Sequence, residues 1–308
     1  MDRSALGIDQ LARFWLESAP ARGVVARLQR CLAEAVARHD YPHAIKALLR
    51  QLAGAALLLA SNLKQPSSIV IQAQGDGPAP LLCVEATHRL TCRAYAQIRH
   101  PSPTPSPHDL SDWVAGAGQG RLVFTIHPEQ GPMYQGIVAL EHASVAALLE
   151  RYLSNSQQTD TRLWLREDGE TLEAALLERL PATNEREAES EQARWREVEA
   201  RLEQAFNQPF MPFPYEEWLA MVFPGETVRS AAAREVSFSC SCSQERAFGA
   251  LRLIGHEELA PIAERDGGID VRCEFCGQHY RIELEALRAF FRRDQLDGLH
   301  PPSTRTLQ

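Results

Sequence analysis

The segment that decides the fold lies near the carboxyl end and contains two close pairs of cysteines. It reads VSFSCSCSQER over Val236–Arg246 and GGIDVRCEFCGQHY over Gly267–Tyr280. One residue separates the first two cysteines, two residues separate the last two, and thirty residues lie between the pairs. Four thiolates with this spacing suit a tetrahedral Zn²⁺ ion. The two sulfur ligands of each close pair are already near each other, so assembling the site costs little chain entropy. We therefore predict one Zn²⁺ per reduced chain, with the ligands Cys240, Cys242, Cys273 and Cys276.

A closed shell of four sulfur atoms limits what such a zinc ion does. It has no open position for water or substrate, which argues against metal-dependent hydrolysis and leaves a structural role or the sensing of oxidants. The spacing favours sensing, because zinc links two points thirty residues apart, and oxidation within each pair would remove that link. Gly277 is expected to turn the chain with its amide facing a thiolate, and His256 and His279 are expected outside the ligand shell.

Composition excludes several classes of protein. The 308 residues are 44% hydrophobic, which is enough for a sizeable core and corresponds to about two domains. The net charge of −8 disfavours nucleic acid or an anionic membrane as the main partner, since both attract positively charged proteins. The longest apolar run, Leu52–Ala60, is too short to span a bilayer, and the first residues show no secretory signal. We expect a cytoplasmic protein.

Residues 1–183 are predicted to form an α+β domain, in which mainly antiparallel strands are joined by short turns. A proline-rich stretch, residues 100–109, is predicted to be a surface loop. Apolar residues at helical spacing predict helices over residues 8–16, 23–37, 45–63 and 145–153. Strand-like runs bounded by turn residues predict strands over residues 68–74, 81–85, 89–98, 121–127, 134–140 and 161–166.

A charged helical linker is predicted over residues 184–235, followed by a zinc domain over 236–292 and a tail over 293–308. Between Glu185 and Ala205 the linker carries seven glutamates and four arginines. A helix of this composition depends on docking its apolar residues on a neighbour; the alternative is a solvated helix without a regulatory role. The residues that form this linker stripe are Trp195, Val198, Leu202 and Phe206.

No catalytic motif is complete, so we predict that the protein is not an enzyme and has no catalytic residues. The glycines between Gly116 and Gly120 precede a strand rather than a helix, which suits a turn and not a phosphate site. The run HEELA at His256 lacks the second histidine of a zinc protease. Cys83 and Cys92 would face each other if a hairpin turned at residues 87–88, and the favoured alternative is two buried thiols.

The carboxyl segment resembles the heat-shock protein 33 family, which comprises redox-regulated holdase chaperones. The two stretches quoted above carry the resemblance, including their cysteine spacings. Further motifs extend it through the chain: APARGVVARL (19–28), IVIQAQGDGPAPLLCVEA (69–86), GQGRLVFTI (118–126), YQGIVAL (134–140) and RYLSNSQQTDTRLWL (151–165).

The resemblance implies both a fold and a switch. The fold would be a core of packed β-sheets with helices, a helical linker and the zinc domain. Reduced members of the family hold zinc and are inactive. Oxidants combined with unfolding conditions release the zinc and form disulfides within each pair, here Cys240–Cys242 and Cys273–Cys276. The zinc domain and the linker then unfold, and the protein, typically a homodimer, holds unfolding client proteins without ATP.

Two other functions were weighed against this one. The main alternative is a zinc-ribbon protein that binds nucleic acid, and a third possibility is an enzyme of the core domain with zinc as a scaffold. Between Val236 and Phe290 there are nine acidic and six basic residues, and a four-thiolate zinc site adds two negative charges, which disfavours nucleic acid. The third has no catalytic residue to support it. We favour a cytoplasmic, redox-switched holdase of oxidative stress, with unfolding proteins rather than nucleic acid or membrane as its partners.

Overall fold

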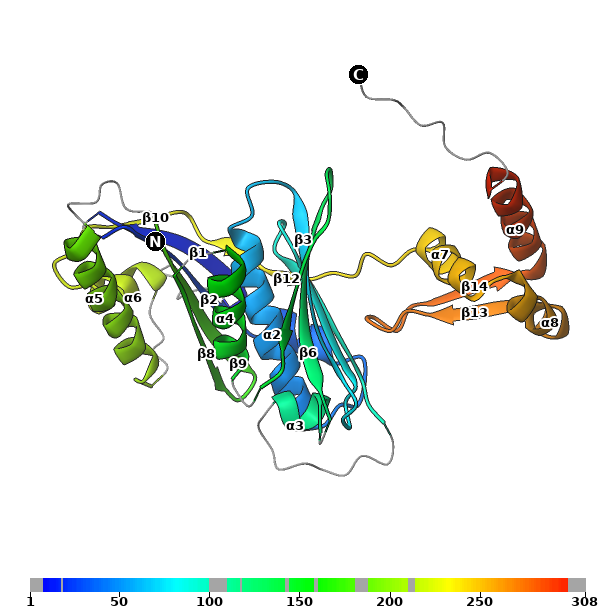
Figure 1. Cartoon of the computed structure of the whole chain (residues 1–308), viewed down its shortest axis with the longest axis horizontal. Coiled ribbons are helices and arrows are strands. Elements are labelled where there is room, and N and C mark those ends of the chain that lie inside the picture. The colour runs from blue at the N-terminus through cyan, green and yellow to red at the C-terminus, as the bar shows by residue number, and fades with distance from the viewer. Residues whose placement is uncertain are drawn as a thin grey trace, which may run out of the picture. The chain divides into compact units, whose positions relative to one another are not determined.

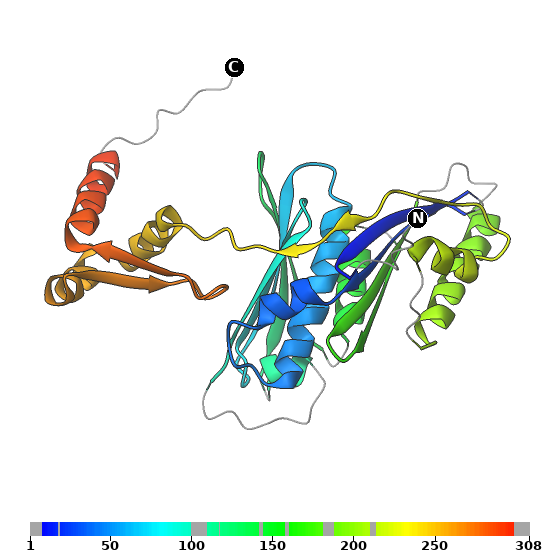
Figure 2. The same cartoon turned by 180° about the vertical axis from the view of Figure 1, so that it is seen from behind.

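In the computed structural model the chain forms two compact units, Met1–Ser239 and Cys240–Gln308. The helix α2 (His43–Ser61) forms the centre of the first and larger unit, where it lies between two β-sheets (Figures 1 and 2). The structure describes residues 8–17, 19–99, 110–116, 118–141, 144–157, 160–180, 188–209 and 214–298.

The first sheet has the strand order β10-β1-β2-β9-β8, and β11 also pairs with β1. All its pairings are antiparallel. Its inner face packs on α2 through residues such as Val24, Leu172 and Leu176, and its outer face carries a second apolar cluster that includes Phe14 and Trp164. The strands are β1 (Gln10–Leu16), β2 (Ala21–Leu28), β8 (Thr161–Asp168), β9 (Thr171–Arg179), β10 (Val228–Ser230) and β11 (Arg234–Glu235).

The second sheet has the order β12-β5-β4-β3-β6-β7. Its pairings are antiparallel except for the parallel pairing of β12 with β5. Alternate residues such as Ile69, Ile71 and Val84 are fully buried in the same apolar core as α2. The strands are β3 (Ser67–Gly75), β4 (Leu81–Thr87), β5 (Thr91–Gln97), β6 (Gly120–Pro128), β7 (Tyr134–Ala139) and β12 (Ser237–Phe238).

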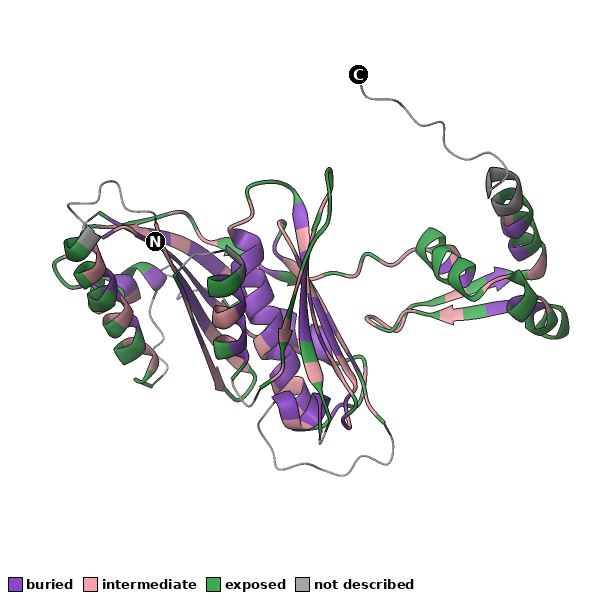
Figure 3. Cartoon of the chain, in the orientation of Figure 1, coloured by how far each residue is buried: buried purple, intermediate pink, exposed green. Residues whose placement is uncertain are grey.

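The helix α2 is buried on nearly all sides, because apolar residues surround it instead of forming one stripe (Figure 3). Among the described residues it is the one helix whose length and composition would suit a membrane span, and 78% of that stretch is buried inside the protein, as in a core helix. Its one buried charge, Arg50, pairs with Glu167 at 3.1 Å. The same unit contains α1 (Arg30–Val36), α3 (Leu110–Val114) and α4 (Val145–Gln157).

The linker contributes two helices to the first unit, α5 (Ala188–Phe206) and α6 (Tyr215–Val222). Both pack on the outer face of the first sheet. The second unit is a β-hairpin with three helices around a small core that includes Leu251, Ile282 and Leu287. Its elements are α7 (Gln244–Ile254), α8 (His256–Asp266), β13 (Gly268–Arg272), β14 (His279–Glu283) and α9 (Leu284–Gly298).

The antiparallel α+β architecture is confirmed, and so is the long buried helix expected over residues 45–63. The two helices predicted over residues 8–16 and 23–37 are wrong, because this part of the chain forms β1, β2 and only the short helix α1. The predicted domain limits stay predictions. The loop expected over residues 100–109 lies outside the described residues, as do residues 181–187 and 299–308.

Candidate metal centre

Two separate stretches of the second unit place the four cysteines. Cys240 and Cys242 lie in the extended chain before α7, and Ser243 caps that helix by accepting a hydrogen bond from the Arg246 amide at 3.3 Å. Cys273 and Cys276 lie in the tight turn between β13 and β14. The last paired residues of this antiparallel hairpin are Arg272 and His279, so strand pairing ends directly beside the second cysteine pair.

The four sulfur atoms converge within 4.8 Å of one another. The Sγ atoms of Cys240 and Cys273 are 3.7 Å apart, and those of Cys242 and Cys276 are 3.4 Å apart. A tetrahedral zinc ion with Zn–S bonds of about 2.3 Å places its sulfur ligands about 3.8 Å from one another. The cluster therefore fits a four-sulfur metal site in both size and donor type. Among the described residues the group comprises cysteines alone, without His256 or His279.

The turn that holds Cys273 and Cys276 depends on Gly277. Its φ of 73° lies in the left-handed region, which glycine adopts without strain. The expectation that the Gly277 amide faces a thiolate is wrong, since this amide donates to the carbonyl of Cys273 at 2.8 Å. The amides of Phe275 and Cys276 donate to the Cys273 sulfur, and the amide of Gln278 donates to the Cys276 sulfur. These amide donors stabilise negative sulfur.

Burial makes the thiols of this cluster weak acids when no metal is bound. It raises the pKa of Cys276 to about 12, and three neighbouring thiols add to this shift. Burial also raises the pKa of Cys273, where the Cys240 thiol adds to the shift and the Cys276 thiol opposes it. A divalent cation reverses this balance, because its charge stabilises the thiolate form of each ligand. The cluster is therefore arranged to give up protons when it takes up a metal.

Tyr280 is a further residue of the centre that sequence reasoning did not single out. Its hydroxyl donates a hydrogen bond of 3.0 Å to the sulfur of Cys242, and this bond raises the pKa of Tyr280 to about 12. The residue sits on β14, one position beyond His279. Tyr280 comes close to Cys242, which lies thirty-eight residues earlier in the chain, only because the β13–β14 hairpin is folded. Such outer hydrogen bonds orient metal ligands.

The linker stripe lies on the outer face of the first sheet. Trp195, Val198 and Leu202 are buried there, and Leu202 is fully inaccessible. Phe206 is partly buried, with its ring 6.1 Å from that of Trp164 on β8. The structure thus brings all four predicted stripe residues onto one apolar cluster. The next two aromatic residues of the linker, Phe210 and Phe213, lie outside the described part of the chain.

Charged residues also hold α5 on the sheet, which the sequence reasoning missed. Glu199 pairs with Arg162 at 2.5 Å, and Glu203 accepts a hydrogen bond of 2.5 Å from the indole of Trp164. Arg166 donates to the carbonyl of Phe206 at 2.9 Å. Because these partners lie on β8, the charged face of the helix is not simply solvated.

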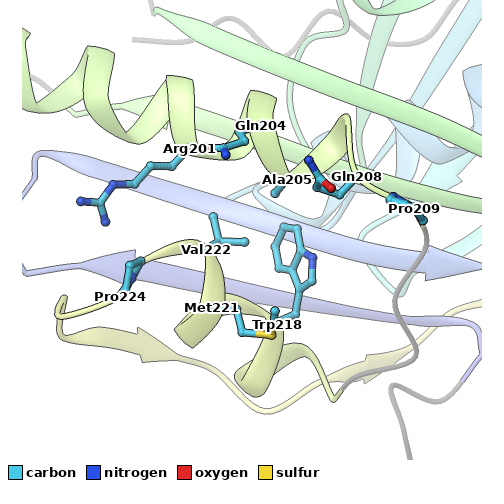
Figure 4. Close-up of a pocket in the computed structure, with 9 residues that line it drawn as sticks. All are labelled: Arg201, Gln204, Ala205, Gln208, Pro209, Trp218, Met221, Val222 and Pro224. Carbon is cyan, nitrogen blue, oxygen red and sulfur yellow. The ribbon is translucent and has the colours of Figure 1, made fainter.

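An apolar pocket of about 370 Å³ lies between α5 and α6 (Figure 4). The indole of Trp218 stands across it from α5, and Met221 at its edge is 52% exposed. The pocket is lined by Arg201, Gln204, Ala205, Gln208, Pro209, Trp218, Met221, Val222 and Pro224. The docked linker therefore already presents apolar surface to solvent.

The remaining cysteines lie inside the first unit. Cys83 pairs in register with Tyr95, and Cys92 pairs with Ala86, so the hairpin turns around residues 88–90 and not at residues 87–88. The two side chains consequently point to opposite faces of the sheet, and the juxtaposition that a turn at residues 87–88 would have given does not occur. Both are buried, as the favoured alternative stated.

A four-cysteine cluster that fits a closed metal site, in a small unit that follows an antiparallel α+β core and two docked linker helices, defines a class of protein. Comparison with known proteins places the chain within this class. The model of the family described as Hsp33 protein matches residues 9–283. The chain belongs to the Hsp33 family and is a chaperone of that family.

The similar proteins are named as chaperones, not as enzymes. The 33 kDa chaperonin of Hahella chejuensis is 36% identical, over 92% of this chain and 97% of that protein. The 33 kDa chaperonin of Nitrosococcus oceani is 35% identical, over 91% of this chain and 94% of that protein. The structure of the 33 kDa chaperonin of Thermotoga maritima matches with a TM-score of 0.70 at 19% identity, covering 94% of this chain and 99% of that one, which supports the fold.

Proposed function

We propose that this protein is a redox-regulated holdase, which binds unfolding proteins without ATP after oxidation of its four-cysteine centre. In the reduced chain Cys240, Cys242, Cys273 and Cys276 would hold one Zn²⁺, and the chaperone would be inactive. The observation that carries this proposal is the convergence of these four sulfur atoms within 4.8 Å in a geometry that fits a closed metal site. We further propose that it works in the cytoplasm and is a homodimer when oxidised.

Peroxide would be the oxidant of each cysteine pair. Two thiols lose their protons and two electrons, a sulfur–sulfur bond forms, and the oxygen–oxygen bond of peroxide breaks to give two water molecules. Bound zinc would supply thiolates, the form of sulfur that oxidants attack. We expect the disulfides Cys240–Cys242 and Cys273–Cys276. In a loosened chain, cysteines with one or two residues between them meet more often than cysteines with thirty residues between them.

Loss of the metal would loosen the second unit, because its apolar core is small. Among the described residues of this unit, its core contains eight fully or nearly buried apolar residues, which is little for an independent fold. Local disulfides cannot replace a link between distant residues. We propose that the linker then leaves the first sheet and frees the linker stripe, which together with the pocket between α5 and α6 would bind exposed apolar segments of clients.

The proposal is tested by following metal, thiols and activity in one sample. Reduced protein and protein treated with peroxide at elevated temperature are compared for bound zinc, thiol number and suppression of light scattering by a heat-denatured enzyme. We expect zinc release, loss of the four thiols of the metal-site cysteines and the appearance of holdase activity together, with the thiols assigned by peptide mapping. Cys276→Ser should bind zinc weakly, whereas the matched control Cys83→Ser should behave as wild type. Full holdase activity of the reduced, zinc-loaded protein would contradict the proposal.

A further inference from the structure

Two buried cysteines of the core lie next to each other, although sixty-one positions separate them in the sequence. Cys31 on α1 is 3% exposed, and Cys92 on β5 is 1% exposed. The helix α1 packs on β5, both cysteines belong to one buried cluster, and the Cys92 side chain acts on the pKa of Cys31, so the two thiols lie near each other. Cys83, by contrast, points to the opposite face of the second sheet, where Gln72 is its partner at 3.8 Å. The core therefore contains one thiol pair and one isolated thiol.

The strand β12 covers this thiol pair. Phe238 of β12 lies beside Cys92 in register, and the amide of Ser239 donates to the Cys92 carbonyl at 3.1 Å. Cys31 lines a pocket of about 370 Å³, and β12 together with Val236 forms one of its walls. The residue after Ser239 is Cys240, the first cysteine of the metal centre. The strand that seals the core thiols is thus continuous with the segment that would loosen on oxidation.

The thiols are unreactive while β12 is in place. The Cys92 side chain raises the pKa of Cys31, and burial and the nearby carboxylate of Asp9 raise it further. Oxidants attack thiolates, so a buried and protonated pair is protected. Removal of β12 would open the pocket wall beside Cys31 and uncover the edge of β5 at Cys92.

We propose that Cys31 and Cys92 are a second oxidisable pair, which forms a disulfide after β12 leaves β5. This inference rests on the proposed function, since loosening of the second unit is what would free β12. One thiol loses its proton, and the thiolate attacks peroxide; the oxygen–oxygen bond breaks to give a sulfenic acid and hydroxide, which takes up that proton and leaves as water. The second sulfur then attacks it, a second water leaves, and the sulfur–sulfur bond forms. The new bond would fasten α1 to β5 and strengthen the core while the rest of the chain unfolds.

The experiment maps disulfides against time in the full-length protein. Wild type is treated with peroxide at a temperature at which zinc leaves, quenched by alkylation at intervals, digested without reductant and examined by mass spectrometry. We expect a peptide pair joined through Cys31 and Cys92 that appears after zinc release, while Cys83 stays alkylated as a thiol. Oxidised wild type should then melt several degrees above oxidised Cys92→Ser.

A variant separates the position of β12 from the state of the metal centre. Phe238→Asp places a charge where an aromatic ring packs on the core, and we expect it to form the Cys31–Cys92 link at least tenfold faster than wild type, even with zinc bound. Ser237→Asp is the matched control, because Ser237 is exposed on the same strand. It should form the link at the wild-type rate.

The outcomes distinguish this inference from the proposed function. If zinc leaves and the two metal-site pairs oxidise while Cys31 and Cys92 remain thiols, the inference is refuted and the proposed function stands. A link that forms equally fast in wild type before zinc release and in Phe238→Asp would refute the sealing by β12. If wild type keeps its zinc under peroxide, the proposed function fails. The formation or absence of the Cys31–Cys92 disulfide in Phe238→Asp then still decides whether these two cysteines can be oxidised.

Discussion

The variant Leu202→Glu tests whether the linker helix controls access to the client-binding surface. Leu202 is fully buried between α5 and the outer face of the first sheet. Removing a buried leucine side chain costs about 2–5 kcal/mol, and leaving an unpaired carboxylate in its place costs several kcal/mol more. Since about 1.4 kcal/mol changes an equilibrium tenfold, a loss of about 4 kcal/mol raises the undocked population of α5 several hundredfold.

The assay is suppression of light scattering by a heat-denatured enzyme in the presence of reductant, with bound zinc measured in the same sample. We expect Leu202→Glu to suppress aggregation while it still holds zinc, whereas reduced wild type does not. The matched control is Ala200→Glu, which adds the same carboxylate at an exposed position of α5. An exposed substitution of this kind changes stability by about 0.5 kcal/mol or less, so this variant should remain inactive.

The reasoning is refuted if reduced Leu202→Glu holds zinc and is as inactive as wild type. In that case the linker stripe would not control activity, and control would lie in the second unit alone. Circular dichroism separates this result from a failed perturbation, because an undocked α5 has too few stabilising contacts of its own to remain helical.

Three further predictions concern the metal centre. Tyr280→Phe removes the hydrogen bond to Cys242 and should weaken zinc binding about tenfold in a chelator competition, with unchanged affinity as the contrary result. Gly277→Ala forces a side chain into a left-handed conformation at a cost of about 1–2 kcal/mol, so it should release zinc at lower chelator concentration than Gly249→Ala in the middle of α7. Zinc affinity should rise with pH between about 6 and 8, because thiol protons leave on binding and burial raises the pKa of Cys276 to about 12; a flat profile would contradict this.

The clustering of the four cysteines could be predicted from the sequence because its information is local. Each cysteine pair is a short motif, and four soft ligands have few other uses in a reducing compartment. The partners that complete the centre could not be predicted in the same way. Tyr280 reaches Cys242 only through the β13–β14 hairpin, and the amide donors to Cys273 depend on the conformation of the turn. Hydrogen bonds that exist only in the folded state leave no periodic pattern in the sequence from which they could be predicted.

The helices predicted in place of β1 and β2 are wrong for a physical reason. The first sheet is covered on both faces, by α2 on one side and by α5 and α6 on the other. A strand buried on both faces loses the alternation of apolar and polar residues, as the run from Gly23 to Ala26 on β2 shows. Leu11 and Phe14 lie three positions apart, which also fits a helix, although here they face opposite sides of the sheet.

The position of α2 has a consequence for how the core can come apart. Both sheets bury their inner faces against this one helix, and its surface is apolar on nearly every side. Lifting either sheet would expose half of the helix to water, and the helix would offer no polar face in compensation. We therefore expect the core to melt as one cooperative block, without a low-cost intermediate in which one sheet survives alone. If oxidation loosens the periphery as proposed, the centre would remain an all-or-none platform during stress.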